Sequence, residues 1–140
     1  MDTTKPAQVT VQTTVNASRE KVWQCWTEPQ HIKQWNFAID TWHCPYAEND
    51  LREGGKFSAR MEAKDGSMGF DFSGTYDEVI PYERIIYTMS DGRKVFVDFS
   101  GNTNTHIKET FDAELQNSID MQRTGWQAIL DNFRDYVESK

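Results

Sequence analysis

The end of the chain, residues 118–140, carries apolar side chains at the spacing of one helix face. The stripe advances by seven, four, three and four residues through Ile119, Trp126, Leu130, Phe133 and Val137. Such steps place side chains on one side of a helix, and that side has to be buried against another element. The sequence before the helix reads as strands and glycine turns, so we predict that a β-sheet covers the apolar face of the helix.

Seven segments ahead of the helix alternate between apolar and polar residues, as half-buried strands do. Asp65-Gly66 and Asp91-Gly92 are tight hairpin signals between neighbouring segments. The pattern predicts an antiparallel meander with one solvated face. The predicted strands are residues 7–15, 42–46, 56–63, 68–80, 84–90, 93–101 and 105–114.

Two short helices are predicted between the first and second strands. Ser18 is suited to cap a helix that carries Val22, Trp23 and Trp26. Pro29 starts a second helix that ends near Trp35, because proline is tolerated in a first helical turn and not inside a helix. The sequence therefore predicts an α+β fold with a single domain over residues 1–140.

Composition and charge exclude several classes of partner. The chain has 140 residues, with 22 acidic against 15 basic side chains and a net charge of −7. This charge repels phosphate backbones and anionic lipid, and no basic cluster offsets it locally, so we expect no nucleic-acid partner. Met1 to Gln8 is polar and no segment has the roughly twenty apolar residues of a membrane span. We therefore expect a soluble, cytoplasmic protein without membrane insertion.

Motifs for metal binding or catalysis are missing from the sequence. Cys25 and Cys44 lack CxxC spacing and are expected to be reduced thiols. The histidines are scattered, and no nucleophile elbow or phosphate-binding loop is present. We predict no metal, no cofactor and no catalytic residue. The three histidines are His31, His43 and His106.

Four stretches of the sequence resemble the SRPBCC superfamily, whose members have the START-like, birch-pollen-allergen-like helix-grip fold. Within it, they are similar to the branch named after the activator of the heat-shock-protein-90 ATPase. The resemblance implies a strongly curved antiparallel sheet wrapped around the long C-terminal helix, with two short helices after the first strand. The stretches are residues 16–23 with 26–29 and Trp35, residues 50–57 (Asp-Leu-Arg-Glu-Gly-Gly-Lys-Phe), residues 74–81 with 84–85 and 87–88, and residues 122–126 with 130–133.

The resemblance implies a cavity between sheet and helix that relatives use for lipids, hormones, polyketides and other apolar molecules. The leading expectation is therefore a binding protein for a small hydrophobic ligand. A chaperone contact is suggested by the branch name alone, and this chain is expected to lack the additional N-terminal region of the eukaryotic activators. A cyclase- or hydrolase-like enzyme that uses the same cavity is the third possibility, because one fold hosts many activities.

The candidate ligand-binding residues are those whose alternation places them on the face toward the helix, together with the helix stripe itself. The alternative is that these side chains fill a solid core, because protein interiors are close-packed. The candidates are Phe57, Met61, Phe70, Phe72, Tyr76, Val97, Phe99, Ile107 and Glu109 from the sheet, and Gln122, Trp126, Ile129, Leu130 and Phe133 from the helix.

Three candidates are polar residues at positions predicted to be buried. Glu109 is the best polar anchor for a ligand, with Arg60 or Arg84 as possible ion-pair partners; the alternative is a shifted strand register that turns its carboxylate to water. Gln122 could bind a ligand at the cavity mouth or hydrogen-bond the sheet backbone. The Tyr76 hydroxyl is expected to make a structural hydrogen bond.

Overall fold

The computed structural model describes residues 7–139. Most of the polar stretch from Met1 to Gln8, and Lys140 at the predicted end of the helix, lie outside the described residues. The elements follow the predicted order. They are β1 (Gln8–Val15), α1 (Arg19–Thr27), α2 (Pro29–Trp35), β2 (Trp42–Asn49), β3 (Lys56–Ala63), β4 (Gly69–Ile80), β5 (Arg84–Met89), β6 (Lys94–Ser100), β7 (Thr105–Asp112) and α3 (Ile119–Glu138).

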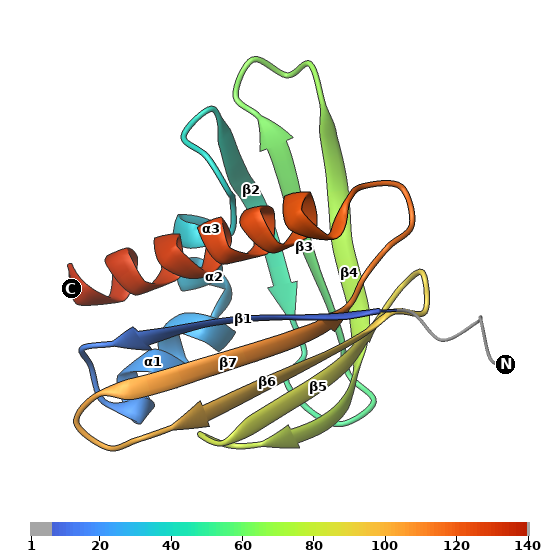
Figure 1. Ribbon diagram of the computed structural model, residues 1–140. Coiled ribbons are helices and arrows are strands. Elements are labelled where there is room, and N and C mark those ends of the chain that lie inside the picture. The colour runs from blue at the N-terminus through green and yellow to red at the C-terminus, as the bar shows by residue number, and fades with distance from the viewer. Residues whose placement is uncertain (1–6, 140) are drawn as a thin grey trace, which may run out of the picture.

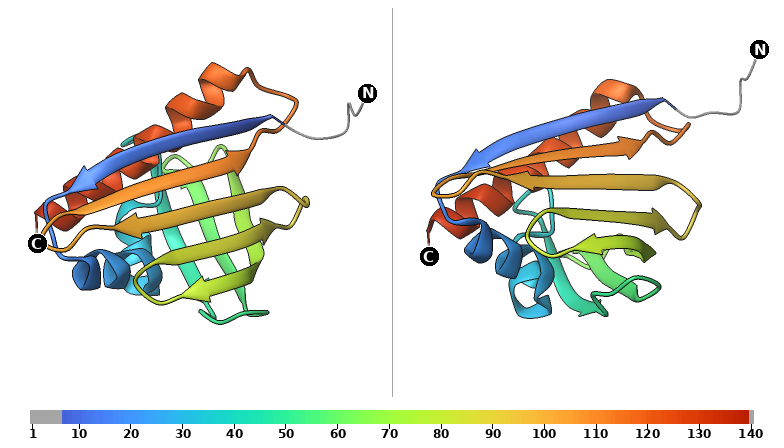
Figure 2. Two further views of the ribbon diagram at one scale, coloured as in Figure 1. Left: turned by 60° about the horizontal axis from the view of Figure 1, so that its bottom comes forward. Right: turned by 90° about the horizontal axis from the view of Figure 1, so that it is seen from below.

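The seven strands form one antiparallel sheet with the order β1-β7-β6-β5-β4-β3-β2. Strands β2 to β7 are a meander, and β1 joins it by pairing with β7. Figure 1 shows the sheet curling around α3, and the left view of Figure 2 shows the outer face of the sheet without a covering helix. The α+β helix-grip fold predicted from the sequence is confirmed.

The inner face of the sheet carries the core. On β5 to β7, alternate residues point inward and are at most 7 % exposed, as period-two patterning requires. The opposite face carries polar partners, for example an ion pair of 2.8 Å between Arg84 Nε and Asp98 Oδ1. The inward side chains include Ile85, Tyr87, Met89, Val95, Val97, Phe99, Ile107 and Phe111.

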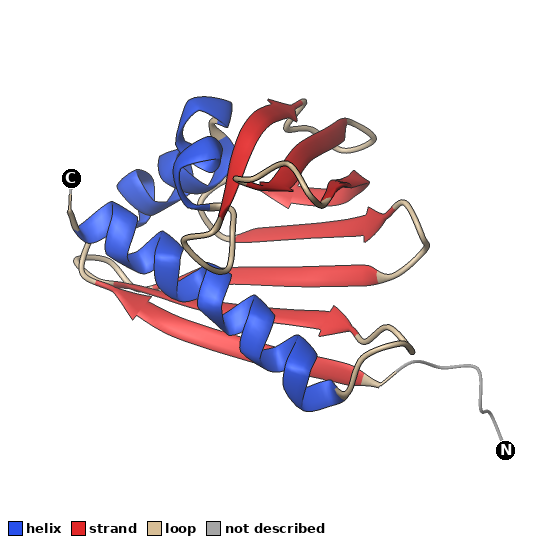
Figure 3. Cartoon of the chain, turned by 90° about the horizontal axis from the view of Figure 1, so that it is seen from above, coloured by secondary structure: helices blue, strands red, loops and turns tan. Residues whose placement is uncertain are grey.

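Helices α1 and α2 close one end of the curled sheet (Figure 3). Ser18 caps α1, because its side chain accepts a hydrogen bond of 3.3 Å from the Lys21 backbone N–H. Pro29 occupies the first turn of α2, as expected. The Trp35 indole N–H donates to the Cys25 carbonyl at 2.9 Å and ties the two helices together. A cluster of indoles is thereby fixed at this end of the fold.

Helix α3 crosses the concave face of the sheet (Figure 3). Ser118 caps it through a hydrogen bond of 3.1 Å from the Met121 backbone N–H. Leu130, Phe133 and Val137 are fully buried, as the stripe predicts. Ile119 is an exception at 37 % exposed, because the first turn of α3 projects beyond the region where the sheet can cover it.

The two edge strands of the sheet are both accompanied by helices. Helix α3 lies beside β1, where Gln127 Nε2 donates to the Gln12 carbonyl at 3.1 Å and Glu138 accepts from the Asn16 N–H at 2.8 Å. At the other edge, β2 packs next to α2 and is longer than predicted, continuing past Tyr46. Its pairing with β3 shifts register between His43 and Tyr46, which bends the strand.

Candidate functional site

A cavity of about 680 Å³ separates the sheet from the first half of α3. Its walls come from β2 to β5, from Glu109 on β7, from α1, α2 and α3, and from the loop before α3. Ten of the fourteen predicted site residues line it. They are Phe57, Met61, Phe70, Phe72, Tyr76, Glu109, Gln122, Trp126, Ile129 and Leu130.

The other four predicted site residues, Val97, Phe99, Ile107 and Phe133, belong to the packed core and do not line the cavity. Aromatic rings from the two short helices fill the space next to them. Phe133 lies edge-on against Trp35 at 4.8 Å between ring centroids, and Phe99 against Trp26 at 5.6 Å. For these four residues, the alternative prediction is correct: their side chains fill a solid core.

Eight aromatic side chains line the cavity. Phe57 contacts Tyr87 and Tyr76 at centroid distances of 4.8 and 5.2 Å, and Phe72 contacts Trp126 at 6.1 Å. The Trp126 indole also stacks on the buried Phe111 ring at 3.9 Å, which fixes its plane. Phe70 lines the outer part of the cavity and is 48 % exposed, because it lies near the free end of β4.

Glu109 places a carboxyl group on the inner face of β7. It pairs in register with Val11 and Val97 and is 6 % exposed, so the predicted alternative of a shifted register is wrong. Burial raises its pKa to about 8. Within residues 7–139, the structure contains no hydrogen bond or ion pair to this carboxyl.

The two arginines suggested as partners of Glu109 point elsewhere. Arg60 pairs with Glu62 at 3.1 Å and with Asp71 at 3.5 Å, whereas Arg84 pairs with Asp98. Both arginines lie on the outer face of the sheet, since their positions alternate with inward residues. The expected ion pair is therefore wrong, and the carboxyl of Glu109 faces the cavity.

Two tyrosines, Tyr76 on β4 and Tyr87 on β5, line the same cavity as this carboxyl. The Tyr76 hydroxyl donates to Asn49 Oδ1 at 2.5 Å, and Asn49 in turn donates to the Thr27 carbonyl, which confirms the expected structural hydrogen bond. Tyr87 also lines the cavity, and its pKa is raised well above the ordinary value by burial and by the nearby Glu109. Tyr87 thus offers a neutral hydroxyl beside the acid.

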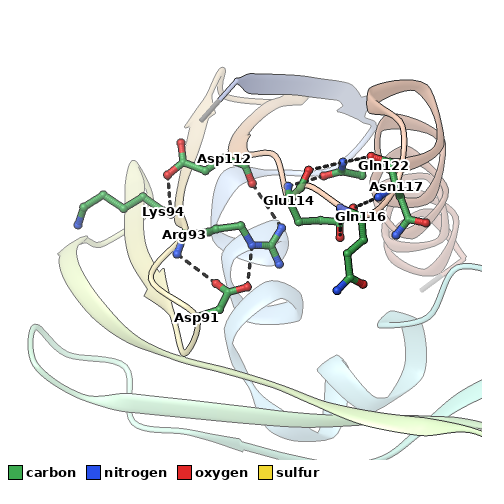
Figure 4. Close-up of polar contacts among 8 residues, drawn as sticks. All are labelled: Asp91, Arg93, Lys94, Asp112, Glu114, Gln116, Asn117 and Gln122. Atoms are coloured by element: carbon green, nitrogen blue, oxygen red, sulfur yellow. Dashed lines mark hydrogen bonds and ion pairs between the residues drawn. The ribbon is translucent and has the colours of Figure 1, made fainter. Parts of the chain in front are cut away.

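Gln122 binds the backbone of the loop that precedes α3, and not the sheet backbone as expected. Its Oε1 accepts from the Glu114 N–H at 2.8 Å, and its Nε2 donates to the carbonyls of Glu114 and Asn117 at 3.0 and 2.9 Å. The Glu114 carboxylate accepts a further bond of 2.7 Å from the Asn117 N–H (Figure 4). This network shapes one end of the cavity and occupies the Gln122 amide.

Arg93 contributes the one basic side chain among the described residues that line the cavity. It faces the loop before α3 (Figure 4). Its Nε binds Asp91 at 2.8 Å and its Nη1 donates to the Asp112 carbonyl at 3.4 Å. These contacts hold the guanidinium at the rim.

Sequence reasoning missed several lining residues, including Trp26, Trp35 and Tyr87. The signal for Tyr87 was present, because it alternates in phase with Ile85 and Met89. The two indoles could not be placed, since their direction depends on how the short helices dock on the sheet.

Two exclusions concern the described part of the chain. Within residues 7–139, no cluster of three or more His, Cys, Asp and Glu side chains is arranged to hold a metal ion. Over the same range, the helices are too short or too polar to cross a lipid bilayer.

Comparison with known proteins identifies relatives of the chain. A family model described as "Activator of Hsp90 ATPase homolog 1-like protein" matches residues 16–138. No protein with a curated description matches significantly. Among solved structures, the AHSA1-like protein from Aeromonas hydrophila is 42 % identical, with a TM-score of 0.89 over 95 % of this chain and 93 % of that one.

Two more solved structures extend the comparison. Chr148 from Cytophaga hutchinsonii is 50 % identical, with a TM-score of 0.82 over 94 % of this chain and 92 % of that chain. CV1439 from Chromobacterium violaceum shares the fold at 21 % identity, with a TM-score of 0.84 over 95 % and 99 % of the two chains. The chain therefore belongs to the Activator of Hsp90 ATPase homolog 1-like family, within the START-like superfamily of helix-grip proteins.

Proposed function

We propose that this protein binds a small hydrophobic molecule, aromatic or lipid-like, in the cavity between the sheet and α3. The observation that carries the proposal is the cavity itself, whose volume of about 680 Å³ lies within the roughly 300–1,000 Å³ of small-molecule sites. The surface that lines it is mainly apolar and includes eight aromatic side chains, with polar groups at defined places. This composition favours a ligand that is apolar over most of its surface.

The architecture adds support for binding over a purely structural role. Protein interiors are stabilised by close packing, and the side chains around an empty space lose van der Waals contacts that they would make in a packed core. The same helix is tightly packed one turn further on, at Phe133. A fold that is closely packed at one end and open at the other is consistent with a protein that binds a ligand in the open part.

A thermal-shift titration with N-phenyl-1-naphthylamine, an uncharged fluorescent aromatic probe, tests the proposal. A ligand at a hundred times its dissociation constant adds about 2.7 kcal/mol to the free energy of unfolding. We therefore expect the melting temperature to rise by about 5 °C or more. Native mass spectrometry of gently purified protein should also show a retained small molecule.

A matched pair of variants locates the bound probe. Gly125 lines the cavity, and a Cβ added there meets no atom within 4 Å, so the side chain of Gly125→Leu begins in open space and occupies part of the cavity. Thr124, the preceding residue of α3, is exposed and does not line the cavity. We expect Gly125→Leu to weaken probe binding and Thr124→Leu to retain it. Equal binding by both variants, or no shift with any apolar probe, contradicts the proposal.

A further inference from the structure

One acidic group in the cavity has no hydrogen-bond or ion-pair partner among the described residues. Glu109 is 6 % exposed, and no side chain or backbone group of residues 7–139 hydrogen-bonds to its carboxyl, which faces the cavity. A buried carboxyl without a partner destabilises a fold unless it stays protonated or meets a complementary group. Its direction into an open space marks the place where a ligand can supply that group.

Among the charged side chains that line the cavity, acidic ones outnumber basic ones. The acids are Glu48, Glu109 and Glu114, against Arg93 alone. Arg93 is already bound by Asp91 and lies at the rim. An anionic head group would therefore meet no free cation next to Glu109, whereas a cationic one would find a carboxylate.

Aromatic rings surround the position that such a cation would occupy. Tyr87 lies close enough to Glu109 for the carboxylate charge to raise the tyrosine pKa, although burial is the larger cause. Phe57 and Phe72 contact Tyr87 at centroid distances of 4.8 and 6.1 Å, and Phe72 also contacts Trp126. The faces of such rings attract cations, most strongly where water is excluded.

We infer that the cavity selects a hydrophobic amine, whose ammonium group pairs with Glu109 and whose apolar body lies against the aromatic wall. This inference rests on the proposed function and names the ligand class for the same cavity. The Tyr87 hydroxyl can accept a second hydrogen bond from the ammonium group. The amide of Gln122 takes no part, since the loop before α3 already binds it.

Binding of an ammonium group has to ionise Glu109, which links affinity to pH. Because its pKa in the empty cavity is about 8, the carboxyl is mostly protonated at pH 7 and releases its proton when the cation enters. The affinity for an amine should therefore rise by about 50-fold between pH 6 and pH 8. Tyr76 and Tyr87 stay neutral in this range because burial raises their pKa.

Three probes that share a naphthalene ring test the selection: 1-naphthylmethylamine, 1-naphthalenemethanol and 1-naphthylacetic acid. We expect isothermal titration calorimetry at pH 7.5 to show the amine binding at least tenfold more tightly than the alcohol, and the acid more weakly than both. Titration in two buffers with different ionisation enthalpies should show release of about one proton per amine bound at pH 7 and none for the alcohol.

The variant Glu109→Gln keeps the size of the side chain and removes the charge. It should weaken amine binding at least tenfold and change alcohol binding less than threefold. If the amine shows no preference over the alcohol in the wild type, or if Glu109→Gln leaves that preference intact, the inference is wrong and the proposed function still stands. Should none of the naphthalene probes bind, nor N-phenyl-1-naphthylamine, the proposed function itself fails. The pH profile and the proton release are measured on the wild-type protein alone. They therefore test the pairing of the amine with Glu109 even if the variant does not fold.

Discussion

The two halves of α3 face the same sheet with the same stripe of residues, yet one half is packed and the other is open. Toward its C-terminus, Phe133 and Val137 are completely buried. Toward its N-terminus, Gly125, Trp126 and Ile129 line the cavity. What differs is the opposite wall. The short helices α1 and α2 fill the space against the C-terminal half, and no helix does so for the N-terminal half (Figure 3).

The two halves of α3 therefore have different roles: the C-terminal half packs the core, and the N-terminal half lines the cavity. The C-terminal half holds α3 in the sheet, so the N-terminal half does not have to contribute much packing energy. The open half is stiffened instead by polar contacts, of which the Gln122 bonds to Glu114 and Asn117 are the most extensive. A rigid cavity wall is thus obtained without filling the cavity.

Truncation of a side chain in the packed half should have the largest effect on stability. Phe133→Ala removes a fully buried ring that contacts Trp26 and Trp35 at centroid distances of 4.9 and 4.8 Å. We expect a loss of about 3–5 kcal/mol of unfolding free energy, measured by urea denaturation. Trp126→Ala, in the open half, should cost less because part of that indole already faces empty space. Equal losses for the two variants would show that the halves are not energetically distinct.

Glu109 should make the stability of the open region depend on pH. Its pKa is raised by burial from the ordinary value of 4.5 to about 8. Between these values the unfolded chain has released the proton and the folded protein has kept it, so the free energy of unfolding falls as pH rises. The loss is on the order of a few kcal/mol across the window, and it stops above pH 8.

Urea denaturation of wild type and Glu109→Gln at several pH values between 4.5 and 8 measures this effect. The difference in unfolding free energy between the two proteins should grow with pH in favour of the variant, because glutamine carries no titrating proton. A constant difference across the window would mean that Glu109 ionises freely in the folded state, and that the carboxyl is not sealed in the cavity.

Gly125 should give the smallest effect, and of the opposite sign. Glycine inside a helix destabilises it by about 0.5–1 kcal/mol relative to alanine, and a Cβ at this position meets no atom within 4 Å. Gly125→Ala should therefore raise the free energy of unfolding by up to about 1 kcal/mol. Gly74→Ala is the matched opposite, since its Cβ would lie 2.5 Å from the Thr88 carbonyl oxygen and 2.9 Å from a Phe57 ring carbon. If Gly125→Ala also destabilises, the space beside it is not open.

The fold could be predicted from local signals because most of them agree with each other. Apolar alternation defines the inner face of β5 to β7, and Asp-Gly pairs mark two hairpins. Alternation also placed Glu109 on the inner face. The resemblance then supplied the curvature of the sheet, which period-two patterning alone does not contain.

The cavity could not be predicted in detail because an empty space has no sequence pattern of its own. Trp126 and Phe133 occupy equivalent places in one stripe, and only the docking of α1 and α2 makes one a cavity wall and the other core. The lack of a partner for Glu109 depends in the same way on where Arg60 and Arg84 point.

The covered edges of the sheet bear on how such an open protein avoids self-association. A sheet edge with free N–H and C=O groups can recruit a strand from another molecule and start aggregation. Here Gln127 binds the Gln12 carbonyl of β1 and Glu138 binds the N–H of Asn16 directly after it, while Pro45 and the register shift distort β2. These features disfavour the addition of a strand from another molecule at both edges. The open cavity therefore does not have to come with a sheet edge that promotes aggregation.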